Sequence, residues 1–186
     1  MKFNVGDQVI YPNQGVGFIE EVLETSVGGN KSEFYRLRLS SNDSLVMVPV
    51  DNAESIGVRR LCSEKDLDKL FDILENGSVD LARDWKNRYK DNVEKMMTGS
   101  IFDVAQVLKN LHYLSLQKPL SFREKKMYDR ARQLVISEIS TVREKEDEQV
   151  DERMEKILVE ACERLLKEEK EAEEAEEAEK AKAASA

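Results

Sequence analysis

The sequence predicts an α+β protein with a small N-terminal β-barrel, a compact all-α domain and an acidic tail. Three observations support this fold class. Short apolar runs separated by turn residues occupy positions 3–50, amphipathic helical patterns occupy positions 63–142, and a low-complexity stretch of Glu, Ala and Lys follows. A chain of 186 residues is long enough for two small domains. We therefore expect domains at 1–60 and 61–143, with a further helix and the acidic tail at 144–186.

The N-terminal segment has the period of β-strands. Apolar runs at 9–11 and 17–19 are separated by turn residues, and residues 34–39 alternate between apolar and charged side chains. A polar turn precedes the run 45–50. Because Pro49 cannot donate a ladder hydrogen bond, this last strand is predicted to lie at a sheet edge or to end there. About five short strands in so short a segment are typical of a Tudor-like (SH3-like) barrel, which closes its sheet and leaves no edge strands.

Helical patterns follow a connector at 51–61 that has no clear period. Ser63 is the predicted N-cap of a first helix that Gly77 ends. Ser121 and Glu124 form a capping-box sequence, because the hydroxyl and the carboxylate can each satisfy a first-turn amide. Four helices are predicted from these apolar stripes: Leu67, Leu70, Phe71 and Leu74; Trp85, Tyr89, Val93 and Met96; Ile101, Val104, Ala105, Leu108 and Leu111; Met127, Ala131, Leu134, Val135, Ile139 and Val142.

A fifth amphipathic pattern from Val150 to Leu165 leads into the acidic tail, which has no apolar face. We therefore expect the tail to be helical or disordered, solvated and mobile. The formal charge of −9 is carried by residues 144–186, where 17 acidic side chains face 8 basic ones. The remaining chain is neutral overall, so the acidic composition does not exclude a nucleic-acid partner.

Enzymatic and metal-binding patterns are nearly absent. Cys62 and Cys162 have neither metal-ligand spacing nor the density of a disulfide scaffold, and they indicate reduced thiols in a cytoplasmic protein. The single histidine, His112, is predicted to be a structural or surface residue of a helix. No apolar run suggests a membrane span or a secretory signal. We therefore expect a protein that is not an enzyme and uses no cofactor or metal.

The segment Trp85–Lys90 combines the only tryptophan with cations and a tyrosine. Its helical spacing allows two interpretations of Trp85. The ring can anchor the core of the helical domain, or it can press against bases while neighbouring cations hold the phosphate backbone. A second set of cations, either a solvated face or a phosphate-binding surface, gathers near the last predicted helix of the domain: Lys118, Arg123, Lys125, Lys126, Arg130 and Arg132.

Four segments resemble the CarD family (CarD/CdnL type) of bacterial transcription regulators. They are FNVGDQVIYPNQGVGFIEEV, LVMVPVDNAESIGVR, DWKNRYKDNVEKMMTGSIFDVAQVLKNL and LSFREKKMYDRARQLVISEI, and they occur in this order between Met1 and Val142. The N-terminal module of the family is similar to the RNA polymerase interaction domain of the transcription-repair coupling factor.

The resemblance implies that the chain docks an edge strand, Val46, Met47, Val48 and Pro49, on the RNA polymerase beta subunit. It also implies a helical domain that contacts promoter DNA near the upstream edge of the −10 region, with Trp85 as a minor-groove wedge and with Lys86, Arg88, Lys90 and Lys125 on the DNA backbone. Asn87 stands where family members often have arginine, and Met47 where some have arginine.

The function expected from the resemblance is that of a cytoplasmic transcriptional activator, nucleoid-associated through RNA polymerase, that stabilises the open promoter complex. We expect it to be a monomer without a membrane partner. The alternative left open by the residues is an adaptor that binds other proteins but not DNA, in which Trp85 is a core residue.

Overall fold

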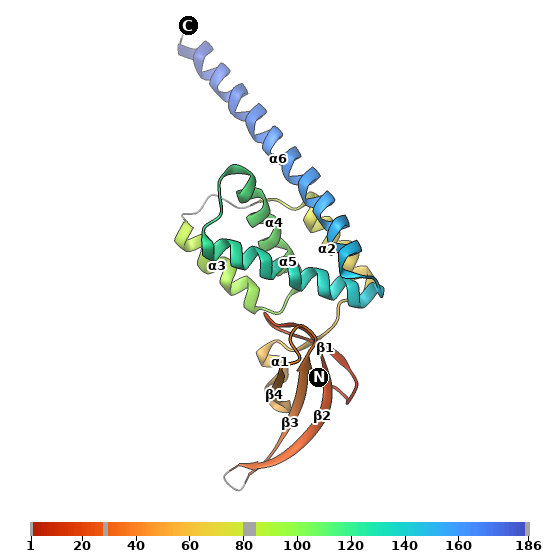
Figure 1. The fold of residues 1–186 in the computed structure, drawn as a ribbon. Helices are drawn as coiled ribbons and strands as arrows, with labels where there is room; N and C mark the ends of the chain where they lie inside the picture. The colour runs from red at the N-terminus through yellow and green to blue at the C-terminus, as the bar shows by residue number, and fades with distance from the viewer. Residues whose placement is uncertain (1, 28–29, 80–84, 185–186) are drawn as a thin grey trace.

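The computed structural model describes residues 2–27, 30–79 and 85–184. Figure 1 shows an N-terminal sheet on one side of a group of helices and a long C-terminal helix that projects from the other side. The expected α+β class is confirmed, because the strands of the described chain precede its long helices. Among the described residues, no helix combines the length and the apolar character needed to cross a membrane.

The sheet of the described chain has five antiparallel strands: β1 (Gln8–Tyr11), β2 (Gly15–Val27), β3 (Asn30–Leu39), β4 (Leu45–Pro49) and β5 (Arg59–Arg60). Their order is β4-β3-β2-β1-β5, so β1 to β4 form successive hairpins. The long hairpin of β2 and β3 was not predicted. A bulge between Ile19 and Glu21 interrupts its register, and β2 curves along its length in Figure 1.

The closed barrel predicted from the sequence is not confirmed. β4 and β5 form opposite edges of the sheet, and no ladder joins them within the described residues. The edge position predicted for the strand that ends at Pro49 is confirmed, because β4 pairs with β3 alone. An irregular β5 of two residues offers too short a ladder to close the sheet.

The segment between β4 and β5 contains two short helical elements. They were not predicted, because the sequence of this segment has no clear hydrophobic period. It forms a 3₁₀ turn, η1 (Val50–Asn52), and one helical turn, α1 (Ala53–Ile56). Gly57 ends α1 at φ 93°, a left-handed conformation that glycine adopts without steric cost. The side chains of Val50, Ala53 and Val58 are buried in the core of the sheet.

The helical region begins with α2 (Glu64–Asn76) and continues through α3 (Trp85–Met97), α4 (Ile101–Gln117), α5 (Phe122–Arg143) and α6 (Asp147–Ala184). Ser63 caps α2 as predicted, and Asp66 completes a capping box with it. The predicted box of Ser121 and Glu124 is also present at the start of α5. Both boxes satisfy first-turn amides that would otherwise lack partners.

Two separate apolar cores lie in the sheet and in the helices. The sheet core contains Phe3, Val9, Ile19, Tyr35, Leu37, Leu39 and Val48, besides the residues of η1 and α1. The helical core is formed by α2, α4 and α5 with Met96 of α3, and Val150, Met154 and Leu158 of α6 complete it. The first part of α6 therefore belongs to the helical core.

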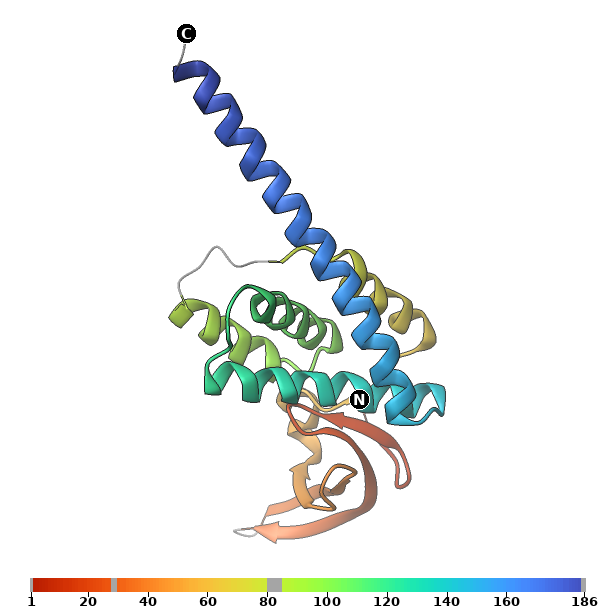
Figure 2. The same ribbon diagram turned by 45° about the horizontal axis from the view of Figure 1, so that its top comes forward.

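The remainder of α6 continues as a helix beyond that core (Figures 1 and 2). Two polar contacts hold its middle part: Arg164 Nη2 donates to the Glu75 carbonyl at 2.8 Å, and the Tyr113 hydroxyl donates to Glu169. Side chains from Lys167 to Ala178 are exposed. The tail is thus helical in this structure and presents a solvated surface, as its composition predicts.

Candidate functional site

The edge strand β4 presents alternating side chains to the core and to solvent. Val48 is buried against Tyr35, whereas Met47 is 46% exposed and Leu45 is 51% exposed. Within the described chain, no strand pairs with the outer edge of β4. The backbone groups of that edge can accept a strand from a partner, and Met47 offers an apolar side chain beside it.

Ion pairs between β2 and β3 lie next to this strand. Arg36 forms an ion pair with Glu21, with Nη1 2.9 Å from Oε2, and its Nε lies 3.3 Å from Oε2 of Glu20, which also accepts a hydrogen bond from Arg38. The bond from Arg38 lowers the pKa of Glu20. Arg36 is the cross-strand neighbour of Met47, so the charges border the exposed edge without occupying it.

The predicted DNA-contact residues lie on two helices. Trp85 and Lys86 form the start of α3, and their side chains fall outside the part of the structure that is described. Lys90 is exposed on α3, with its Nζ 3.8 Å from Glu94. Lys125 is exposed on the first turns of α5. Lys90 and Lys125 are thus available to a ligand in solution.

Arg88 differs from these lysines because its side chain is buried. It is 8% exposed, and its Nη2 lies 3.5 Å from Glu124 Oε1. Glu124 also accepts from the amide of Ser121 at 2.9 Å and from its hydroxyl at 2.6 Å. Burial opposes the ionisation of Glu124, but the bonds from Ser121 and Arg88 outweigh it and lower the pKa of Glu124. Arg88 therefore ties α3 to the capping box of α5.

This contact shifts the buried face of α3 from the one predicted. The apolar stripe placed Tyr89 and Val93 toward the core, but Val93 is 37% exposed and Tyr89 is only partly buried. Met96, a member of the predicted stripe, is buried as expected, and the buried face continues through Asn92 and Arg88, four and eight positions earlier. The prediction was wrong for Tyr89 and Val93 because an ion pair with Glu124 allows an arginine to be buried, which apolar periodicity cannot reveal.

Two cations of the predicted basic cluster are used inside the molecule. Arg130 Nε donates to the Asn13 carbonyl at 3.0 Å, which links α5 to the turn between β1 and β2. Arg132 Nε donates to Asp151 at 2.7 Å, and its Nη1 donates to Glu155, which links α5 to α6. The cluster is therefore divided between structural contacts and the exposed surface.

Arg59 and Glu138 form the centre of the joint between sheet and helices. Nη1 and Nη2 of Arg59 donate to the two carboxylate oxygens of Glu138 at 2.6 and 2.9 Å, and the Cys62 amide donates to Oε1 at 2.9 Å. Glu138 is 1% exposed. Glu138 was not predicted from the sequence. A carboxylate four positions after Leu134, on the buried stripe of α5, was the available signal.

Close backbone contacts reinforce this joint. A Cβ at Gly57 would lie 2.9 Å from Pro12, and a Cβ at Gly99 would lie 2.8 Å from the Gly57 carbonyl. Both glycines have positive φ, so a side chain at either position would meet conformational strain as well as a steric clash. The sheet and the helical region therefore pack directly against each other.

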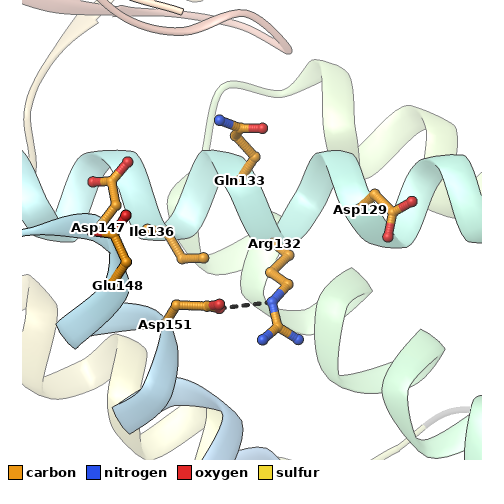
Figure 3. A pocket seen from close by; sticks show the side chains of 7 residues that line it. All are labelled: Asp129, Arg132, Gln133, Ile136, Asp147, Glu148 and Asp151. Atoms are coloured by element: carbon orange, nitrogen blue, oxygen red, sulfur yellow. Dashed lines mark hydrogen bonds and ion pairs between the residues drawn. The ribbon is translucent and has the colours of Figure 1, made fainter.

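A pocket of about 320 Å³ lies between α5 and α6 (Figure 3). Its acidic lining residues are Asp129, Asp147, Glu148 and Asp151. Arg132 also lines the pocket and donates a hydrogen bond to Asp151. Across residues 2–27, 30–79 and 85–184, no group of three or more His, Cys, Asp or Glu side chains is arranged to hold a metal ion.

The two cysteines and the single histidine are partly or fully buried. Burial and the Glu138 carboxylate raise the pKa of the Cys62 thiol to about 12, and burial raises the pKa of Cys162 to about 11. His112 is 5% exposed with Nδ1 2.9 Å from the Tyr128 hydroxyl, and burial lowers its pKa. The structural interpretation of His112 is confirmed. Both thiols are protonated at neutral pH and therefore poor nucleophiles.

Comparisons with known proteins match both halves of the chain. A family model described as CarD-like/TRCF RID domain matches residues 3–62, and one described as CarD, C-terminal domain matches residues 69–155. YdeB of Bacillus subtilis (strain 168), named as a candidate transcription factor, is 33% identical over 141 residues, covering 76% of this chain and 92% of YdeB. The solved structure of CdnLNt from Myxococcus xanthus is 38% identical, covers 34% of this chain and 90% of that chain, and has a TM-score of 0.30.

Proposed function

The chain belongs to the CarD family, and from this premise we propose that it is a transcription factor that interacts with RNA polymerase. The observation that carries the proposal is the match of the RID model to residues 3–62, which include the whole sheet. The family is of a transcription-factor type, and a non-enzymatic role accords with it. We further propose domains at 1–60 and 61–143, followed by a segment at 144–186 whose first helical turns complete the helical core, and a Tudor-like relationship for the sheet.

The surface proposed for the polymerase beta subunit is the outer edge of β4, with Val46, Met47, Val48 and Pro49. Main-chain hydrogen bonds along this edge would supply affinity, and the exposed Met47 would supply an apolar contact. Val48 contributes indirectly, because its buried side chain fixes the strand on the sheet core.

The surface proposed for promoter DNA, near the upstream edge of the −10 region, is the start of α3 with the exposed lysines of α3 and α5. Trp85 acts as a wedge that lowers the cost of a distorted base step, while Lys86, Lys90 and Lys125 contact phosphates. Arg88 is assigned a positioning role, because its buried guanidinium faces Glu124. Holding both surfaces on one molecule raises the effective concentration of the weak DNA contact once polymerase is bound. We expect these contacts to slow the re-pairing of the melted promoter DNA. The protein would then activate promoters at which the lifetime of the open complex is limiting.

The polymerase surface is tested by binding of the full chain to the isolated beta subunit lobe. Met47→Asp should abolish binding, because it places a charge at the apolar edge while leaving the core intact. Val22→Asp is the matched control, since Val22 is also exposed at 38% but lies on β2, away from the edge. Equal binding by both variants would remove β4 from the interface.

The DNA surface is tested by the lifetime of the polymerase–promoter open complex. Trp85→Ala should shorten it while binding to the beta lobe stays unchanged, and Trp85→Phe should restore part of it. An unchanged lifetime with a folded Trp85→Ala variant would favour the adaptor function, in which Trp85 is a core residue. We propose a cytoplasmic, nucleoid-associated monomer, which size-exclusion chromatography with light scattering can test.

A further inference from the structure

Phe122 is an aromatic side chain displayed on the surface among cations. It is the first residue of α5 and is 73% exposed, the largest exposed fraction among the described large apolar side chains. Lys126 Nζ lies 4.7 Å from the ring centroid, one helical turn further along α5. The ring is in contact with water in the free protein. A ligand that covers it would remove this apolar surface from water, which favours binding.

A hollow of about 230 Å³ lies between α3 and α5, and Lys126, which contacts the Phe122 ring, is one of its lining residues. Tyr89, Val93 and Met97 line it from α3, and Arg123, Lys126 and Met127 line it from α5. Lys126 belongs to both features, which joins Phe122 and the hollow into one surface, here called the Phe122 surface. The volume is below the ~300–1,000 Å³ typical of sites for drug-sized ligands, so it suits a single planar ring.

The Phe122 surface is cationic although the chain carries a net charge of −9. Among the described residues that line the hollow, none is acidic, and Arg123, Lys126 and Arg130 are basic. Glu124, the acidic residue nearest in sequence, turns inward and is 9% exposed because it accepts from Ser121 and faces Arg88. The surface is therefore complementary to an anion that also carries an apolar or aromatic group.

We propose that the Phe122 surface binds unpaired bases of single-stranded nucleic acid. The Phe122 ring stacks on a base, the methionine-lined hollow receives a neighbouring base, and Arg123 and Lys126 contact the phosphates between them. A nucleic-acid strand supplies one planar ring and one phosphate per nucleotide, and stacking on aromatic side chains is its usual mode of sequence-tolerant binding. The inference rests on the proposed function and extends it, because a strand opened near the Trp85 end of α3 would place such bases within reach.

The test measures fluorescence anisotropy of the full chain with two labelled probes, a short single-stranded oligonucleotide and a fully paired duplex of the same length. Phe122→Ala should weaken single-strand binding at least about fivefold and change duplex binding by less than about twofold. Phe122→Trp should restore the loss, since it keeps a stacking ring. Leu116→Ala is the matched control, because Leu116 is also exposed, at 44%, but does not line the hollow.

The phosphate contacts are tested separately by salt dependence. Lys126→Ala should lower the slope of log affinity against log salt by about 0.7 on the single strand. Lys69→Ala, which removes an exposed lysine of α2, should leave the slope unchanged.

Three outcomes would overturn the inference. The first is an equal loss of affinity for the single strand and the duplex in Phe122→Ala, and the second is no loss of affinity for either. The third is Phe122-dependent binding of a labelled polyglutamate peptide that is tighter than binding of the single strand, which would assign the surface to an acidic protein. These measurements contain no polymerase, so their failure is distinguishable from failure of the open-complex test with Trp85→Ala.

Discussion

Replacing Glu138 with Gln removes the charge that Arg59 faces across the joint between sheet and helices. The substitution keeps the shape of the side chain and one acceptor oxygen, but it places an NH₂ group where the second oxygen accepted from Arg59. Two hydrogen bonds, at 2.6 and 2.9 Å, are reduced to one, and the remaining bond joins the charged guanidinium to a neutral acceptor in place of a carboxylate.

The magnitude follows from the burial of the two partners. The Glu138 side chain is 2% exposed, whereas that of Arg59 is 28% exposed. Removing one partner of a buried pair costs about 3–5 kcal/mol. Water can reach Arg59 in part, so we expect the lower end, about 3 kcal/mol of unfolding free energy. In a protein of this size that corresponds to a melting temperature about 6–12 °C lower.

Thermal unfolding followed by circular dichroism measures the loss, and spin labels report the joint itself. Labels at Thr25→Cys on β2 and Glu163→Cys on α6 occupy exposed positions on either side of the joint. We expect a narrow distance distribution that broadens with Glu138→Gln. Glu171→Gln is the control, because its ion pair with Lys167 is exposed. If Glu138→Gln behaves like this control in both measurements, the Arg59–Glu138 pair does not hold the joint.

Three further predictions concern the helical region. Arg88→Ala should cost about 3 kcal/mol because it leaves Glu124 buried without its cation, whereas Lys90→Ala should cost at most about 0.5 kcal/mol; urea titration measures both. Because the pKa of Glu124 is lower in the folded protein, its ionisation stabilises the fold at pH values above its ordinary pKa of 4.5. The free energy of unfolding should therefore fall as the pH drops through the lower folded-state pKa, and it should fall less steeply in Glu124→Gln. Truncation after Lys170 should leave unfolding unchanged within about 0.5 kcal/mol, whereas Leu158→Ala should cost about 2–5 kcal/mol.

Features encoded by neighbouring residues could be predicted from the sequence. The capping box of Ser121 and Glu124 needs only residues three apart, and the stripe of α4 needs only a period of 3.6. The edge position of β4 followed from Pro49, since a missing amide is a local property. The number of short strands led to the expectation of a closed sheet, but closure requires pairing between β4 and β5, which their own residues do not determine.

Features that depend on distant partners could not be predicted. Arg88 resembles a surface cation until Glu124, 36 residues later, is placed beside it. Glu138 resembles an ordinary helical carboxylate until Arg59 is placed opposite it. The exposure of Phe122 has the same origin, because its neighbours in the folded chain, and not its own hydrophobicity, decide whether it is covered.

Helix α5 connects the joint between sheet and helices to the Phe122 surface. Glu138 is fixed at the joint, and Phe122 lies sixteen positions earlier on the same helix, roughly 24 Å away at 1.5 Å per residue. A rotation of about 5° at the joint would therefore displace the Phe122 end by roughly 2 Å, which is enough to break a hydrogen bond or a stacked contact. We therefore expect the rigidity of the Arg59–Glu138 joint to determine how accurately the Phe122 end of α5 is positioned when the sheet is bound to a partner.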